Sequence, residues 1–298
     1  MDTRRNDLPP AQFGLPYDCK PTLNDAQVFD FCRKGYLILE GVVDDDVNRR
    51  MMAFAAEHTD HQPLELLTED WFVEGVFKNP QAAGAVRSLL GANFKLPQTL
   101  CNHRADGPLP PQDWHRDGGS IYNNRIDYLQ VFYYPQDTPP EMGPTELIPG
   151  SHFMRSKANY MGHIRSVKPV KSTSSPAGTV TITAYPIWHR RGRSVLPGVR
   201  HLFKYNYFRT AEPRRDWVID PEHDFSWPDM SEVEPHFEQF RCGIAAAELF
   251  SWLCGEQFSY VGGTGWPCEA PVKPGLCDQE GLPAGLRRFA EAGIAELA

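Results

Sequence analysis

Apolar residues recur at helical spacing in the first third of the chain. Within residues 25–34, Val28, Phe31 and Cys32 fall on one side of a helix that Asn24 can cap. A helix with such a face buries it against a core. The pattern therefore predicts an amphipathic helix at the start of the folded part.

More regular structure of the same kind follows. Residues 36–39 predict a short strand, the acidic residues 44–46 open a second amphipathic helix, and residues 80–90 predict a third helix. We therefore expect an N-terminal helical part over about residues 25–93.

From residue 94 onward, short apolar runs alternate with Gly, Pro, Asn and Asp. The runs at 129–134, 179–184 and 202–208 are typical of strands separated by turns. Helices followed by many strands favour a mainly β fold with a helical flank. We expect a double-stranded β-helix, also called a jelly roll, over about residues 94–210.

The remainder of the chain, residues 211–298, changes pattern again. Residues 211–235 are rich in Pro, Trp and acidic residues and predict a long loop, which a helix near 235–254 follows. A Gly- and Pro-rich stretch at 262–281 predicts another loop before a short terminal helix. We expect these elements to form a lid or a dimerisation element within a single domain spanning residues 1–298, in a monomer or a homodimer.

Charge and composition narrow the partners. A formal net charge of −8 argues against a nucleic-acid partner, because such proteins present a basic face. The chain starts without the apolar run of a signal peptide, and no later stretch is long enough to span a bilayer. We expect a cytoplasmic protein with no membrane partner, acting on a small molecule.

One tripeptide and one distant histidine predict a metal site. His115 and Asp117 flank a single residue, so on a strand both side chains point the same way. His189 would complete two imidazoles and one carboxylate on one face of an ion, which suits non-haem Fe(II) with open positions. Such a tripeptide also arises by chance, and Asp117 has an alternative as a turn residue before Gly118.

Three further stretches occur in a particular order around these residues. The segment 143–152 reads Gly-Pro-Thr-Glu-Leu-Ile-Pro-Gly-Ser-His, Arg200 follows His189 by eleven positions, and residues 29–41 contain Phe-Asp-Phe and Gly-Tyr-Leu-Ile-Leu-Glu-Gly. Together with the His-x-Asp tripeptide, they resemble the phytanoyl-CoA dioxygenase family over about residues 25–210.

The resemblance implies an Fe(II)- and 2-oxoglutarate-dependent dioxygenase that uses O2. Such an enzyme hydroxylates, or otherwise oxidises, an unactivated C–H bond of a small organic substrate and releases succinate and CO2. The setting expected is secondary-metabolite or lipid metabolism. The alternative is an oxygen-independent, metal-binding isomerase or epimerase of the cupin type, which shares the barrel but has no need of Arg200.

The resemblance also implies which residues bind the cosubstrate. Arg200 would hold the distal carboxylate of 2-oxoglutarate, because a guanidinium matches a carboxylate with two parallel hydrogen bonds. His189 and Arg200 would lie on adjacent strands joined by the turn 196–198. The other candidates for cosubstrate binding are Gln112, Thr145, Asn102 and Ser194, and Ser194 departs from the asparagine that the family usually has there.

Two histidines compete with His189 as the third ligand. His201 directly follows Arg200 and would face away from it on one strand. His152 belongs to the Pro-Gly-Ser-His turn, where a histidine that stabilises the loop is the favoured reading.

Aromatic and basic residues supply candidates for the substrate pocket. Residues 189–215 contain eight Lys and Arg but a single acidic residue. This composition predicts either a basic rim for an anionic substrate or a solvated face. Most aromatic residues of the predicted strands are expected in the core, and some would face a hydrophobic substrate. The candidates for pocket residues are Tyr122, Tyr133, Trp188, Arg191 and Trp217.

Overall fold

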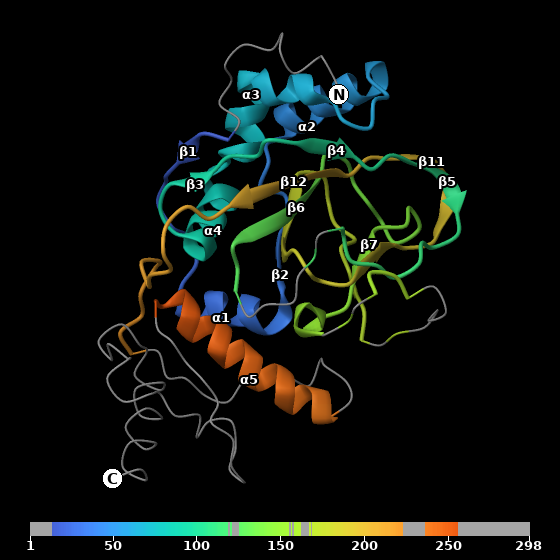
Figure 1. Cartoon of the computed structure of the whole chain (residues 1–298). Coiled ribbons are helices and arrows are strands. Elements are labelled where there is room, and N and C mark those ends of the chain that lie inside the picture. Colours follow the sequence, from blue (N-terminus) through green and yellow to red (C-terminus); the bar gives the residue numbers. More distant parts are fainter. Residues whose placement is uncertain are drawn as a thin grey trace, which may run out of the picture.

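Antiparallel strands form the centre of the structure, with helices above and below them in the view of Figure 1. The computed structural model describes residues 14–118, 120, 125–154, 156, 158–161, 167, 169–222 and 236–255. The helices are α1 (Asp25–Lys34), α2 (Asp45–Glu57), α3 (Asp70–Phe72), α4 (Pro80–Leu90) and α5 (His236–Leu253), with shorter helical turns at Leu64–Thr68, Val73–Phe77 and Ser151–Phe153. The strands are β1 (Pro16–Tyr17), β2 (Tyr36–Leu39), β3 (Phe94–Lys95), β4 (Leu100–Asn102), β5 (Ala105–Leu109), β6 (Tyr128–Tyr134), β7 (Thr145–Leu147), β8 (Lys171–Ser172), β9 (Thr179–Ala184), β10 (His189–Arg191), β11 (Ser194–Arg200) and β12 (Phe203–Phe208).

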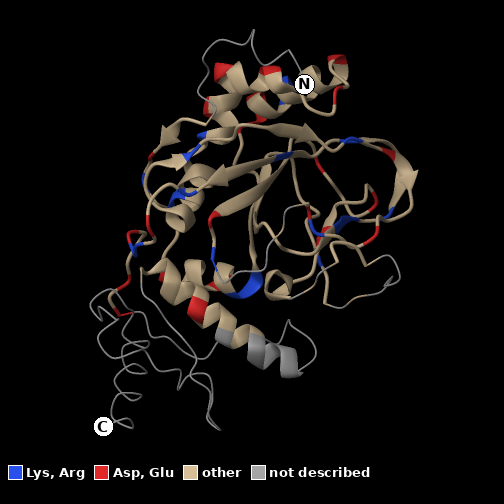
Figure 2. Ribbon diagram, viewed as in Figure 1, with Lys and Arg blue, Asp and Glu red and all other residues tan. Residues whose placement is uncertain are grey.

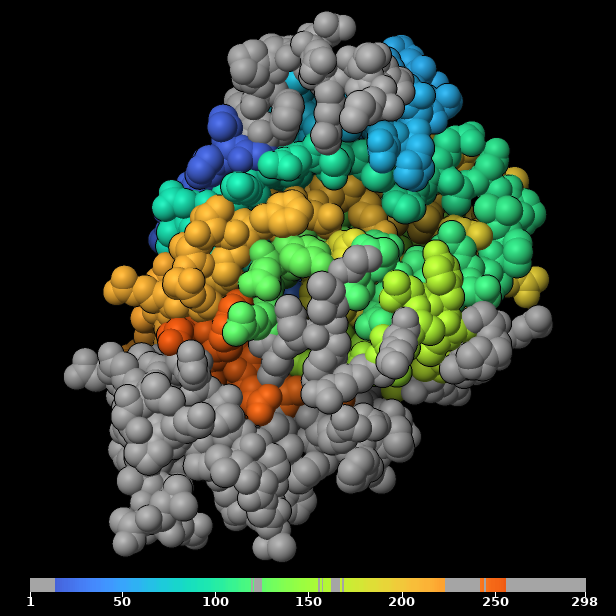
Figure 3. Space-filling model, in the orientation of Figure 1, coloured from blue at the N-terminus to red at the C-terminus, as the bar shows by residue number. Residues whose placement is uncertain are grey.

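The strands form one large sheet and two small ones. The large sheet has the order β1-β3-β12-β6-β9-β2, and β4 pairs with β12. The surfaces of β4 and β12 accordingly lie next to each other in Figure 3. The small sheets are β10-β7-β8 and β11-β5. This arrangement is the expected jelly roll with a helical flank.

Alternation along the central strands gives the large sheet two different faces. On β6, Leu129, Val131 and Tyr133 pack into the core beneath the helices. Phe132 and Tyr134 belong to a second core, on the side of the small sheets. Successive side chains of a strand point to opposite faces, and the helices cover one face of this sheet. A site can therefore form on the other face, toward the small sheets.

The helical layer forms where the sequence predicts it. Helices α1, α2 and α4 match the segments expected from apolar spacing, and Asn24 and Gln27 form a capping box at the start of α1. Helix α1 ends at Gly35, whose φ of 79° favours glycine. The acidic residues of α2 and α3 lie on the outer side of this layer (Figure 2).

The C-terminal part is described only in pieces. Helix α5 confirms the helix expected near 235–254, and it packs on α1 through an edge-to-face contact of Phe29 with Phe250 at 5.3 Å. Residues 211–222 contain neither helix nor strand, as expected for a loop. The loop at 262–281 and the terminal helix lie outside the described residues. Within the described part, no helix combines the length and the apolar character that a membrane span requires.

One local expectation is wrong. Residues 196–198 do not form a turn between two adjacent strands; they lie within β11, where the pairing with β5 shifts register. β10 and β11 belong to different small sheets. Gly198, at φ 118°, accommodates this irregularity.

Candidate metal and cosubstrate site

Backbone hydrogen bonds hold the two histidines of the predicted triad side by side. The N–H of His115 donates to the carbonyl of His189 at 3.0 Å, and the N–H of His189 donates back at 2.9 Å. The preceding residues, Trp114 and Trp188, are fully buried in a separate apolar cluster with Ile148. Because side chains alternate, burying the tryptophans turns both imidazoles toward the opposite side.

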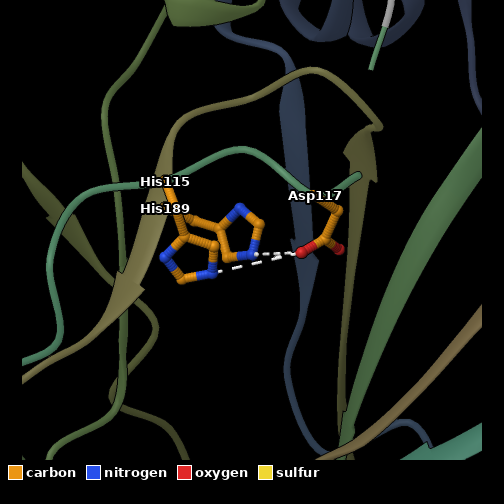
Figure 4. A group of neighbouring side chains, drawn as sticks. All are labelled: His115, Asp117 and His189. Carbon is orange, nitrogen blue, oxygen red and sulfur yellow. Dashed lines mark ion pairs between the residues drawn. The ribbon is translucent and has the colours of Figure 1, made fainter. Parts of the chain in front are cut away.

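Asp117 completes the triad (Figure 4). Its Oδ1 lies 4.0 Å from Nε2 of His115 and 3.6 Å from Nε2 of His189. The ligand atoms of all three residues lie within 4.8 Å of one another. An ion with bonds of roughly 2.1 Å would draw these ligand atoms closer together than they lie here.

The remaining nitrogen of each imidazole is held by the backbone. Nδ1 of His115 lies 2.9 Å from the carbonyl of Asp113, and Nδ1 of His189 lies 3.1 Å from the carbonyl of Ile187. These contacts orient the rings and direct both Nε2 atoms toward Asp117, as in established metal sites. Nε2 of His189 is buried and has no hydrogen-bond partner, which fits a metal ligand.

Two polar side chains hold the other carboxylate oxygen of Asp117. Oδ2 lies 2.5 Å from Nζ of Lys204 and accepts a hydrogen bond from Nε2 of Gln130. Burial opposes ionisation of Asp117, but the charge of Lys204 and the hydrogen bonds from Lys204 and Gln130 hold the pKa of the carboxyl below its ordinary value. Burial and Lys204 lower the pKa of His189. At neutral pH the site therefore presents a carboxylate and a neutral imidazole, the forms that bind metals.

A cavity of about 270 Å³ opens beside these ligands. Arg200 lines it and is buried, with Nη1 donating to the carbonyl of Gly143 at 3.1 Å. Nε of Arg200 is buried without a partner. Burial lowers the pKa of Arg200, nearby Arg191 adds to this effect, and Tyr134 opposes it. The guanidinium thus keeps an unpartnered donor in the wall of a cavity that His115 and His189 also line.

A family comparison agrees with this arrangement. The family model described as phytanoyl-CoA dioxygenase (PhyH) matches residues 31–190. The chain belongs to the phytanoyl-CoA dioxygenase family. The cofactors expected from the sequence, Fe(II), 2-oxoglutarate and O2, fit this family and this ligand set.

Solved structures with the same fold act on or bind diverse small molecules. HygX from Streptomyces hygroscopicus, solved with nickel and 2-oxoglutarate, aligns with a TM-score of 0.52 at 16% identity, covering 63% of this chain and 88% of its own. The carbocyclase SnoK from nogalamycin biosynthesis aligns at 0.52 and 17% identity, with 67% and 91% covered. The epimerase SnoN aligns at 0.51 and 16% identity, with 62% and 83% covered. No curated protein matches the sequence.

Three further residues expected to bind the cosubstrate of this family line the cavity with Arg200: Gln112, Thr145 and Asn102. Oε1 of Gln112 accepts the N–H of Arg191 at 3.1 Å, and the amide of Asn102 contacts Nδ1 of His201 at 3.1 Å. Ser194 lies elsewhere. Its Oγ accepts the N–H of Leu109 at 2.9 Å, so it joins β11 to β5 and is not among the residues lining the cavity.

Of the four substrate-pocket candidates that the structure describes, Arg191 alone lines the cavity. Tyr133 lies on the helical face of the sheet, where its hydroxyl donates to Oδ1 of Asn48 at 2.7 Å. Trp188 is buried in the tryptophan cluster. Nε1 of Trp217 donates to Asp25 at 2.7 Å, at the start of α1. Alternation along β6 and before β10 explains the first two corrections, and Tyr122 lies outside the described residues.

The two competing histidines have other roles. Nε2 of His152 lies 3.0 Å from the carbonyl of Cys32, so His152 ties the Pro-Gly-Ser-His turn to α1, as expected. His201 contacts Asn102 and is not part of the triad.

Sequence reasoning missed several residues that contact the site. Lys204 and Gln130 hold Asp117, and His61 and His103 line the cavity. Burial, together with Lys204 and His61, lowers the pKa of His103 to about 3. A signal was present, because a lysine or glutamine between apolar neighbours in a buried strand costs free energy unless it has a polar partner.

Proposed function

We propose that this protein is an Fe(II)- and 2-oxoglutarate-dependent oxygenase that oxidises a C–H bond of a small organic molecule, with hydroxylation as the outcome. One observation carries the proposal. Nε2 of His189 and Nε of Arg200 are buried without a hydrogen-bond partner, and both residues line the same cavity. A metal ion would satisfy the first atom and a carboxylate the second, which is what a metal-chelating dicarboxylate requires.

Each residue has a distinct task in this proposal. His115, Asp117 and His189 would hold the iron, and His115 and His189 also line the cavity. Arg200 binds the distal carboxylate of 2-oxoglutarate in bidentate fashion. Thr145 on β7 pairs with Arg191 on β10, and both residues line the cavity. Phe132 and Leu202 supply apolar wall that limits water. When bound, the iron and 2-oxoglutarate supply the oxygen-activating chemistry, and succinate and CO2 leave as products.

The test is an anaerobic titration of the metal-free protein with Fe(II) and 2-oxoglutarate, followed by the visible metal-to-ligand charge-transfer band. We expect the band in the wild type and in Arg193→Ala, a control at an exposed arginine near the site. We expect its loss in His189→Ala and a much higher 2-oxoglutarate requirement in Arg200→Ala. Bound metal without a band would refute the proposal.

Structural neighbours of this fold include an epimerase and a carbocyclase, so the reaction outcome needs its own test. Incorporation of label from ¹⁸O2 into the product would support hydroxylation. Turnover without O2 would instead support the oxygen-independent isomerase or epimerase considered from the sequence. The cytoplasmic setting in secondary-metabolite or lipid metabolism stays a prediction.

A further inference from the structure

The cavity carries more positive charge than the metal and cosubstrate roles use. Its described lining residues include no Asp or Glu but five basic residues. These are Arg104, Arg190, Arg191, Arg200 and Lys204. Such a wall raises the local concentration of anions and favours their binding.

Three of the five cations face a carboxylate outside the cavity lining. Nε of Arg190 lies 2.6 Å from Glu146, and Nζ of Lys204 lies 2.5 Å from Asp117. Arg104 lies 3.7 Å from Asp106, in a contact between two exposed side chains that contributes little. The charges of Arg190 and Lys204 are therefore already balanced within the protein.

Arg191 and Arg200 have no such partner among the described residues. Nη1 of Arg191 donates to the carbonyl of Gly192 at 3.2 Å, and Arg200 donates to that of Gly143. Arg191 is half-buried, Arg200 is buried, and both line the same cavity. Two cations in the wall of one cavity, without counter-ions, form a site for anions.

Position on the strand explains why Arg191 faces this cavity. It follows His189 by two residues on β10, so its side chain lies on the same face as the metal ligand. Its N–H and carbonyl are both bonded to Gln112, which fixes the backbone at this point. Arg191 is thus held at the edge of the metal site.

In the proposed function, Arg200 receives the distal carboxylate of 2-oxoglutarate, and this leaves Arg191 without an anion. We propose that Arg191 binds an oxyanion of the primary substrate, a carboxylate or a phosphate. The inference rests on the proposed function for its assignment to the primary substrate. The cavity of about 270 Å³ lies just below the range of roughly 300 to 1,000 Å³ that is usual for small-ligand sites, so the substrate is a small anionic metabolite.

The test measures anion binding separately from cosubstrate binding. Protein loaded with Ni(II) and saturated with 2-oxoglutarate is titrated calorimetrically with inorganic phosphate and, in a second series, with acetate. The variants are Arg191→Gln, Arg191→Lys and the exposed control Arg193→Gln. The affinity of each variant for 2-oxoglutarate is measured in parallel.

We expect Arg191→Gln to weaken binding of at least one anion by about ten- to a hundredfold, the range for a lost hydrogen bond to a charged group. Arg191→Lys should retain part of the binding, Arg193→Gln should bind like the wild type, and 2-oxoglutarate affinity should stay within about twofold. Whichever of phosphate and acetate binds more tightly identifies the group.

Two results would overturn the inference: equal anion affinity in Arg191→Gln and wild type, or a loss of 2-oxoglutarate affinity in Arg191→Gln, which would assign Arg191 to the cosubstrate. A wild type that binds phosphate through Arg191 but binds no 2-oxoglutarate would refute the proposed function and leave the anion site standing.

Discussion

Replacing Lys204 by Met should destabilise the metal-free protein far more than the metal-loaded one. Lys204 is the counter-charge of Asp117 when no metal is present, at 2.5 Å, with exposed side-chain fractions of 12% and 21%. In the variant, the half-buried carboxylate keeps Gln130 as its remaining donor. A bound metal ion supplies the missing positive charge, so the deficit should shrink once the site is filled.

The size of the effect follows from the geometry. Two unit charges 2.5 Å apart attract by about 7 kcal/mol at an effective dielectric constant of 20. The desolvation cost of burying the lysine, which the variant avoids, offsets part of this attraction. Breaking a buried pair typically costs about 3 to 5 kcal/mol. The retained bond to Gln130 favours the lower end, so we expect about 3 kcal/mol, or roughly 6 °C in Tm for a chain of this size.

The assay is thermal and urea unfolding of wild type, Lys204→Met and Lys204→Arg, each without metal and with saturating Zn(II) as a redox-silent ion. Lys95→Met, at an exposed lysine on β3, controls for the substitution itself. Zinc binding stabilises the folded state of both proteins, but only in Lys204→Met does the ion also replace the missing counter-charge of Asp117. We therefore expect zinc to reduce the Lys204→Met deficit by half or more. An equal deficit with and without zinc would refute the view that Lys204 and the metal share Asp117.

Three further predictions concern stability. Gly35→Ala should cost more than about 2 kcal/mol in urea unfolding, because φ is 79° and the new Cβ would lie 2.4 Å from Nδ1 of His152; a cost below about 0.5 kcal/mol would contradict this. Burial lowers the pKa of His152 from 6.5 to about 4, so the unfolded state takes up the proton first when the pH is lowered. The free energy of unfolding therefore decreases as the pH falls from about 6.5 to about 4, by up to about 1.4 kcal/mol per pH unit. His152→Gln should remove that part of the slope in a pH series of unfolding curves, and an unchanged slope would count against it. Tyr133→Phe should cost about 1 to 3 kcal/mol by leaving Oδ1 of Asn48 without its donor, while Zn(II) affinity measured by competition stays the same; weaker zinc binding would contradict its placement on the helical face.

Local signals were sufficient to predict much of the fold. The helices α1, α2 and α4 carry apolar stripes, and α1 also carries a capping residue, so their positions follow from the sequence nearby. The strands β6, β9 and β12 are apolar runs of typical length. The short strands β7, β8 and β10 have two or three residues each, and they form because distant segments pair with them. No local pattern of that length identifies a strand.

The site divides in the same way. The spacing of His115 and Asp117 predicts that their side chains point the same way. The family motif identifies His189 and Arg200. The position of Ser194 and the contacts of Lys204 depend on which strands meet, which a single sequence does not state. Trp188 was expected in the pocket because it is aromatic and next to a ligand, yet being next to a ligand on a strand is the reason that it points away.

On the central strands β6 and β12, the residues that pack the core therefore alternate with the residues that contact the metal ligand Asp117. On β12, Phe203, Tyr205 and Tyr207 pack under the helices, while Lys204 between them reaches Asp117. On β6, Gln130 does the same between Leu129 and Val131. A polar residue at these alternate positions is tolerated in a buried strand because the metal ligand satisfies it. The aromatic neighbours in turn hold the strand that carries it, so a change on the helical face reaches the site through the backbone register, whereas a change at Lys204 or Gln130 acts through direct contact with Asp117.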